Sequence, residues 1–63
     1  MDWNRRELED VRVALDRYLH TLREELASTD ARDMREGLRE LIGRYELLLA
    51  RVESELGRML AAA

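Results

Sequence analysis

The sequence predicts an all-α protein, an antiparallel two-helix hairpin that assembles into a four-helix bundle. Apolar residues recur at helical spacing in each half of the chain, and a short polar segment separates the two halves. The chain has 63 residues and no cysteine, so its core is small and no disulfide can supplement it. We therefore expect a partner chain to complete the fold.

The first helix is expected at about residues 3–27. Steps of three and four residues separate its apolar side chains, which places them along one face of a helix. This first stripe consists of Leu8, Val11, Leu15, Leu19, Leu22 and Leu26.

Residues 28–30 are expected to form the turn. The short polar side chains of Ser28, Thr29 and Asp30 can accept hydrogen bonds from the free N–H groups at the start of a helix. Asp30 is the expected N-cap of the second helix, with Asp33 three residues later at its positive end. A connection this short makes the two helices antiparallel neighbours.

The second helix is expected at about residues 31–60, and it carries a similar stripe. The second stripe consists of Leu38, Leu41, Tyr45, Leu49, Val52 and Leu56. Both stripes repeat every eleven residues, as from Leu8 to Leu19, which predicts nearly straight helices or a slight right-handed coil. The alternative is that flanking apolar residues widen the stripes enough to satisfy the seven-residue repeat of a coiled coil as well.

The apolar surface around each helix is wider than one neighbouring helix can cover. Further apolar side chains flank the two stripes, at Trp3, Ala14, Tyr18, Ile42, Leu48 and Met59. An exposed apolar patch of this length marks an interface, so the stripes are predicted to form both the core and the oligomer interface. A homodimer is the expected assembly, with a higher oligomer or a different protein partner as alternatives.

A second line of residues without charge runs along the opposite side of the second helix. It consists of Gly43, Leu47, Ala50, Ser54 and Gly57. Small residues let another helix approach closely, so this line is a possible second interface. The alternative is a weakly charged face in solvent.

The charge pattern and the lack of long apolar stretches argue against several classes of function. The net charge is −3 and 40% of the residues are charged, with both signs interleaved along the chain, which argues against binding to a polyanion. No apolar stretch approaches the roughly 20 residues of a membrane span. The acidic start lacks an apolar signal core, so we expect a cytoplasmic protein. All eleven basic residues are arginine, a usage typical of GC-rich bacterial genomes.

No enzymatic activity is expected. The chain has neither a nucleophile with its base nor a glycine-rich phosphate loop. Asp16, His20 and Glu24 lie four residues apart on one side of the first helix, a spacing that suits a metal ion, but they lie away from the apolar stripe. We interpret them as a solvated face and predict no catalytic residues, no metal and no cofactor.

The hairpin resembles Rop-like proteins, homodimeric four-helix bundles that modulate pairing between RNA molecules. The resemblance rests on the length, Leu22 and Leu26 before the turn, the Asp30-Ala31 pair, and Leu41 with Leu48 after it. It implies the architecture. It does not carry over the RNA-binding surface of paired first helices, whose positions here are Trp3, Asp10, Ala14, Tyr18 and Glu25. Two carboxylates there would face phosphate groups.

The sequence therefore predicts a small interaction protein that scaffolds or regulates a partner as a helical-bundle oligomer. The alternatives are a Rop-like RNA-binding modulator and an accessory subunit of a larger assembly. The sequence identifies neither the partner nor the process.

Overall fold

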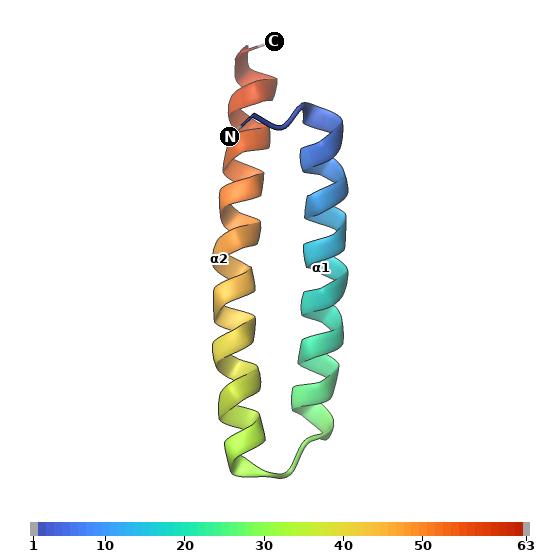
Figure 1. Cartoon of the computed structure of the whole chain (residues 1–63), viewed down its shortest axis with the longest axis vertical. Coiled ribbons are helices and arrows are strands. Elements are labelled where there is room, and N and C mark those ends of the chain that lie inside the picture. Colours follow the sequence, from blue (N-terminus) through green and yellow to red (C-terminus); the bar gives the residue numbers. More distant parts are fainter. Residues whose placement is uncertain (1, 63) are drawn as a thin grey trace.

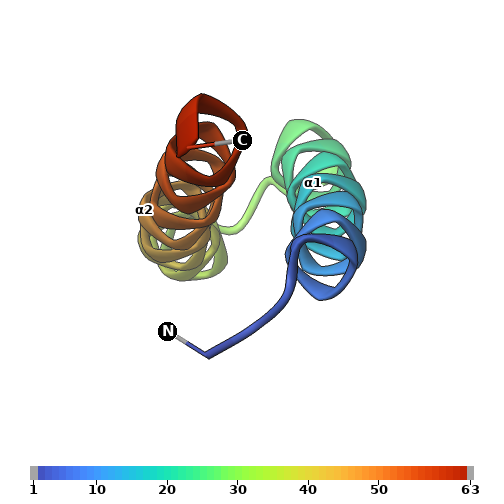
Figure 2. The same ribbon diagram turned by 90° about the horizontal axis from the view of Figure 1, so that it is seen from above.

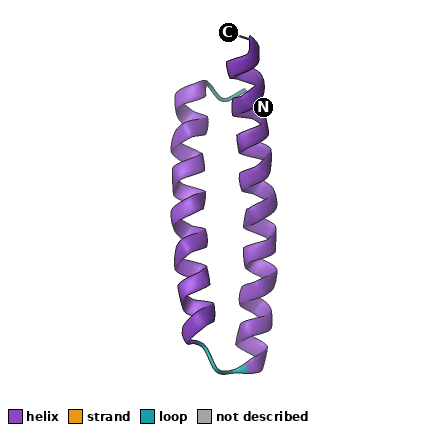
Figure 3. Cartoon of the chain, turned by 180° about the vertical axis from the view of Figure 1, so that it is seen from behind, coloured by secondary structure: helices purple, strands orange, loops and turns teal. Residues whose placement is uncertain are grey.

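The computed structural model describes residues 2–62, which form two helices joined by a short loop. α1 spans Arg5–Ser28 and α2 spans Arg32–Ala62. The helices run antiparallel and side by side, with the loop at one end of the molecule, as Figures 1 and 3 show. The hairpin is 47 Å long and 16 by 14 Å across. The predicted helical hairpin is confirmed.

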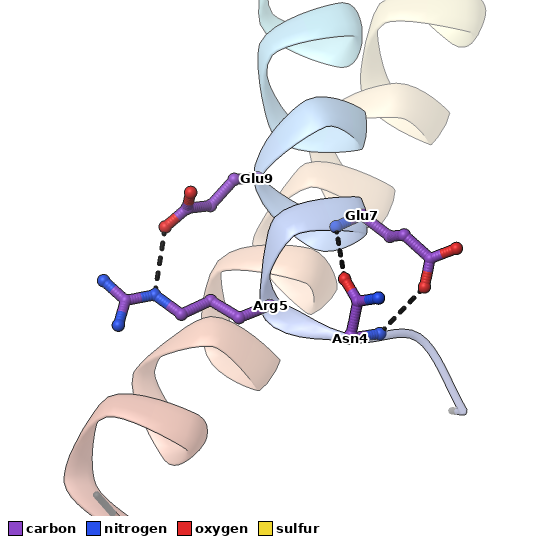
Figure 4. Close-up of polar contacts among 4 residues, drawn as sticks. All are labelled: Asn4, Arg5, Glu7 and Glu9. Carbon is purple, nitrogen blue, oxygen red and sulfur yellow. Dashed lines mark hydrogen bonds and ion pairs between the residues drawn. The ribbon is translucent and has the colours of Figure 1, made fainter.

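A capping box fixes the start of α1. The Asn4 side chain accepts a hydrogen bond from the Glu7 N–H at 2.9 Å, and the Glu7 carboxylate accepts one from the Asn4 N–H at 3.0 Å (Figure 4). Because both partners satisfy groups that a helix end leaves free, Asn4 is the last residue before the helix. α1 thus begins at Arg5, slightly later than the predicted start at about residue 3.

The end of α1 is secured by an arginine from the other helix. Nη1 of Arg35 donates to the backbone oxygens of Leu26 at 2.6 Å and Thr29 at 2.8 Å. α1 has no basic residue in its own last turn. The Arg35 guanidinium therefore supplies the positive charge that the carbonyl end of a helix favours.

We call these two Arg35 contacts the clamp. They bind carbonyl oxygens at the end of α1 and in the loop, and α2 itself begins one residue later than a cap at Asp30 would place it. The first backbone hydrogen bond of α2 runs from the Arg35 N–H to the Ala31 oxygen at 3.0 Å. Ala31 is therefore the residue at the N-cap position, and the prediction of Asp30 was wrong by one residue. Asp33 does lie in the first turn, where a carboxylate favours the positive helix end.

The core consists of two small clusters along the line where the helices meet. Near the chain ends Leu8 packs with Val52 and Leu56, and nearer the loop Leu19 and Leu22 pack with Ile42. Among residues 2–62, only Leu8 and Leu19 are fully buried. Each of the twelve residues of the two predicted stripes is buried or half-buried in the hairpin. Many of these side chains are only half-buried, so part of each remains accessible to solvent.

Replacing Arg35 by alanine should lower the stability of the hairpin. The substitution removes two hydrogen bonds from a charged donor to the carbonyl groups of Leu26 and Thr29, so we expect a loss of about 1–2 kcal/mol. Urea denaturation followed by far-UV circular dichroism, at one fixed protein concentration, measures it. Arg39→Ala is the matched control, because Arg39 is exposed on the same helix. Equal losses for the two variants would show that the clamp contributes nothing.

Candidate functional site: an open apolar face

The two long sides of the hairpin, where side chains of α1 and α2 meet, differ in polarity. On one side Arg23 and Glu46 join the helices, with 2.8 Å between Nη2 and Oε2. Arg35 and Ile42 lie on the same side of α2, since spacings of seven and four residues bring them into line with Glu46. Ile42 is buried there. Polar groups that bind each other therefore close this side.

The other side is apolar and open. The rings of Tyr18 and Tyr45 meet edge-on across it, with centroids 5.1 Å apart and planes at 82°. Nearer the chain ends, Val11 and Leu15 of α1 and Leu48 of α2 line a shallow hollow between the helices. Leu41 lies seven residues before Leu48, on the same side of α2. We call this surface the open apolar face, and it consists of Trp3, Val11, Leu15, Tyr18, Leu41, Tyr45, Leu48 and Met59.

Trp3 reaches this face from the segment that precedes α1. That segment joins the first turn of α1 and passes along one side of the hairpin toward α2, as the view down the helices in Figure 2 shows. The Trp3 side chain lines the same hollow as Val11 and Leu48. It extends the face to the end of the molecule opposite the loop.

The open apolar face is incompletely covered within one chain. Trp3 is 44% exposed, and Tyr18 and Leu48 are each 43% exposed. Val11, Leu15, Leu41 and Met59 are half-buried. Contiguous apolar surface of this extent is typical of an interface with another protein.

Charged residues of opposite sign border the two edges of the face. On α1, Glu7 and Asp10 lie beside Trp3 and Val11 around a second hollow, and we call these two carboxylates the acidic rim. On α2, Arg51 lies beside Leu48 and Val52, and Arg58 follows Arg51 around the hollow that Ser54 and Glu55 also line. Arg44 precedes Arg51 by seven residues, so Arg44, Arg51 and Arg58 form one row, the basic rim. Glu55 lies within this row and binds Arg58.

The small-residue line of α2 lies away from α1. Leu47 is 70% exposed, and Ala50, Ser54 and Gly57 are exposed as well. A Cβ atom built on Gly43 or Gly57 meets no side chain or other backbone within 4 Å. Gly43 is half-buried, but no atom of α1 lies close to where the Cβ of either glycine would be, so no packing requirement within one hairpin explains the two glycines.

The acidic and histidine side chains do not converge on a site. His20 Nε2 lies 3.4 Å from Glu24 Oε1, and both side chains are exposed. Across residues 2–62 no three His, Asp or Glu side chains are placed to hold a metal ion. Every buried side-chain nitrogen or oxygen in that range has a hydrogen-bond partner. Neither α1 nor α2 contains a stretch long and apolar enough to cross a membrane.

No protein-family model, curated protein or solved structure matches the chain. The open apolar face and its two rims are therefore the candidate functional site. All residues of this face belong to the predicted stripes and their flanks, but helical periodicity alone does not separate the two sides of the hairpin. The row of arginines at seven-residue spacing beside Leu41 and Leu48 was the signal that marks the edge of α2.

Replacing both Gly43 and Gly57 by alanine tests the small-residue line. Because the added methyl groups meet open space in the hairpin, the double variant should gain up to about 1 kcal/mol per site from the better helix propensity of alanine. Thermal denaturation at fixed concentration and sedimentation measure stability and mass. A second interface along this line would show itself by the reverse result, a less stable or less associated variant, because the methyl groups would clash with a close-packed helix.

Proposed function

We propose that this protein is a non-enzymatic interaction protein that scaffolds or regulates a partner, and that its working unit is a homodimer in which two hairpins form a four-helix bundle. The open apolar face is the observation that carries the proposal. The residues around it bind and pack; none is arranged for chemistry on a substrate.

The energetics favour covering this face. A two-helix chain of this length buries little surface, which leaves it a small stability margin alone. Among residues 2–62, six are buried in its core. Fully burying one large apolar side chain contributes about 1.5–3 kcal/mol, so covering several half-exposed ones contributes several kcal/mol. The residues of the face extend along α2 from Leu41 to Met59, about 27 Å at 1.5 Å per residue, on a hairpin 16 Å wide.

The same surface argues against the Rop-like alternative of RNA binding. Two of the positions implied by the resemblance, Asp10 and Trp3, border one hollow together with Glu7. Phosphate contacts from basic side chains provide most of the affinity for nucleic acids, and this edge of the molecule is acidic. The remaining alternative is an accessory subunit of a larger assembly. In that case another protein, and not a second copy of the chain, would cover the open apolar face.

Sedimentation of the protein at micromolar concentration should give about twice the monomer mass of 7.4 kDa. Leu48→Asp should reduce the mass to that of the monomer, because the charge would have to be buried at the interface. Leu47→Asp is a matched control from the neighbouring residue, which lies off the open apolar face and is 70% exposed. A monomeric wild-type chain would overturn the homodimer and favour the accessory subunit. Dissociation by Leu47→Asp alone would move the interface to the small-residue line.

Structured RNA should keep its electrophoretic mobility when mixed with low micromolar protein near physiological salt. The expectation follows from the carboxylates at the acidic rim, which repel phosphate groups. Asp10→Arg provides the comparison, since it reverses one rim charge. A shift by the wild-type protein that weakens steeply with added salt would instead support the Rop-like modulator.

A further inference from the structure

We propose that the two hairpins pack with α1 of each copy against α2 of the other and with both loops at the same end of the bundle. This inference rests on the homodimer proposed above and specifies its arrangement. In this arrangement a second copy of the chain covers the open apolar face. The acidic rim of each copy then lies along the basic rim of its partner.

Two symmetric arrangements bring the open apolar faces of two hairpins together. In the first, the two-fold axis runs parallel to the helices, so α1 lies against the partner's α2 and the two loops share one end. In the second, the axis runs across the helices, so α1 lies against the partner's α1, α2 lies against the partner's α2, and the loops lie at opposite ends. The apolar residues alone favour neither arrangement, because both bury the same face.

The rims distinguish the two arrangements because their heights along the hairpin are known. Leu8 packs with Val52 and Leu56, so the acidic rim at residues 7–10 lies at the height of residues 51–58. An axis parallel to the helices keeps the partner's α2 at that same height. Asp10 then lies level with the partner's Arg51, and this pair is the attractive contact at each edge. Glu7 lies level with the stretch between the partner's Arg51 and the partner's Arg58. That stretch also carries Glu55, whose carboxylate already binds Arg58 within each hairpin. Opposite charges meet on both sides of the bundle.

Tyr18 would make a second favourable contact with the basic rim in this arrangement. Its contact with Tyr45 places it at the height of residues 44–45 of α2. In the same arrangement the partner's Arg44, the first arginine of the basic rim, lies level with the exposed part of the Tyr18 ring. A guanidinium over an aromatic face is a favourable cation–π contact.

The second arrangement sets like charges against each other. Glu25 follows Tyr18 by seven residues and Val11 by fourteen, so it lies on the same edge of α1 as the acidic rim but near the loop. When two α1 helices pack antiparallel, Glu7 and Asp10 lie near the partner's Glu25. The two basic rims also meet each other, offset in part by Glu40 near the loop end. Like charges side by side disfavour this arrangement.

Distances between spin labels separate the two arrangements. The chain has no cysteine, so Asp30→Cys in the exposed loop provides a single labelling site. In the proposed arrangement the two loops are neighbours, and pulsed electron paramagnetic resonance should give about 20–25 Å, given helix axes 8–10 Å apart and the reach of the labels. With the loops at opposite ends the distance would approach the 47 Å length of the hairpin. A label at Arg17→Cys, near mid-height on α1, is the control and should give dipolar coupling at a distance well below 47 Å in both arrangements, because the midpoints of the two hairpins stay side by side. The distance is shorter when the two α1 helices are neighbours.

Each result has one meaning. A short distance at residue 30 supports the proposed arrangement. A long distance at residue 30 with a short one at residue 17 overturns the arrangement while the homodimer stands. No dipolar coupling at either site, together with a monomer mass, overturns the homodimer itself.

Charge reversal provides an independent test of the rims. Asp10→Arg should raise the dissociation constant of the dimer roughly five- to tenfold at low salt, because two attractive contacts become repulsive, and adding Arg51→Glu should restore most of the loss. Asp16→Arg changes the same charge on α1 away from the rim, beside His20 and Arg23, and should have little effect. In the second arrangement Asp10→Arg would relieve repulsion from the partner's Glu25. Unchanged or tighter dimerisation by Asp10→Arg would therefore overturn the proposal.

Discussion

Two helices that lie side by side shield each other along a single line of contact. In this hairpin the line holds two small clusters, and only Leu8 and Leu19 on it are fully buried. The helices carry apolar arcs wider than that line, so part of each arc stays in contact with water. The open apolar face follows directly from this geometric limit, and so does the expectation that a second chain covers it.

The two sides of the contact line have different roles. On the closed side, Arg23 with Glu46 and Arg35 with the loop carbonyls satisfy polar groups within the chain. These contacts stabilise the loop and join the helices without requiring a partner. On the open side, aromatic and aliphatic side chains meet across the groove without a polar cover. The closed side therefore satisfies its polar groups within the chain, whereas the open side leaves apolar side chains exposed.

Apolar burial and charge contribute differently to the proposed dimer. Covering the open apolar face supplies the affinity, since burial depends on area and hardly on direction. The acidic rim and the basic rim add little affinity, because contacts between exposed charges are weak. They select the arrangement, since one pairing of helices brings opposite charges together and the other brings like charges together. That arrangement separates the two α1 helices, so the surface of paired first helices on which Rop-like RNA binding relies would not form.

The sequence by itself determined the two helices, their antiparallel order and the faces they turn inward, because spacings of three and four residues are a property of the single helix. It also contained the Asn4–Glu7 capping box, a local pattern that the predicted boundary overlooked. Only the tertiary structure decided which shoulder of α2 is buried: Ile42 and Leu48 both flank the stripe, yet Ile42 packs against Leu19 and Leu22 while Leu48 stays 43% exposed. It likewise decided that Arg35 of α2 binds the carbonyl groups of Leu26 and Thr29 at the turn. The burial of Ile42 and the contacts of Arg35 have the same physical reason. Periodicity determines only where a residue lies around its own helix, whereas burial and long-range hydrogen bonds depend on where the neighbouring helix lies.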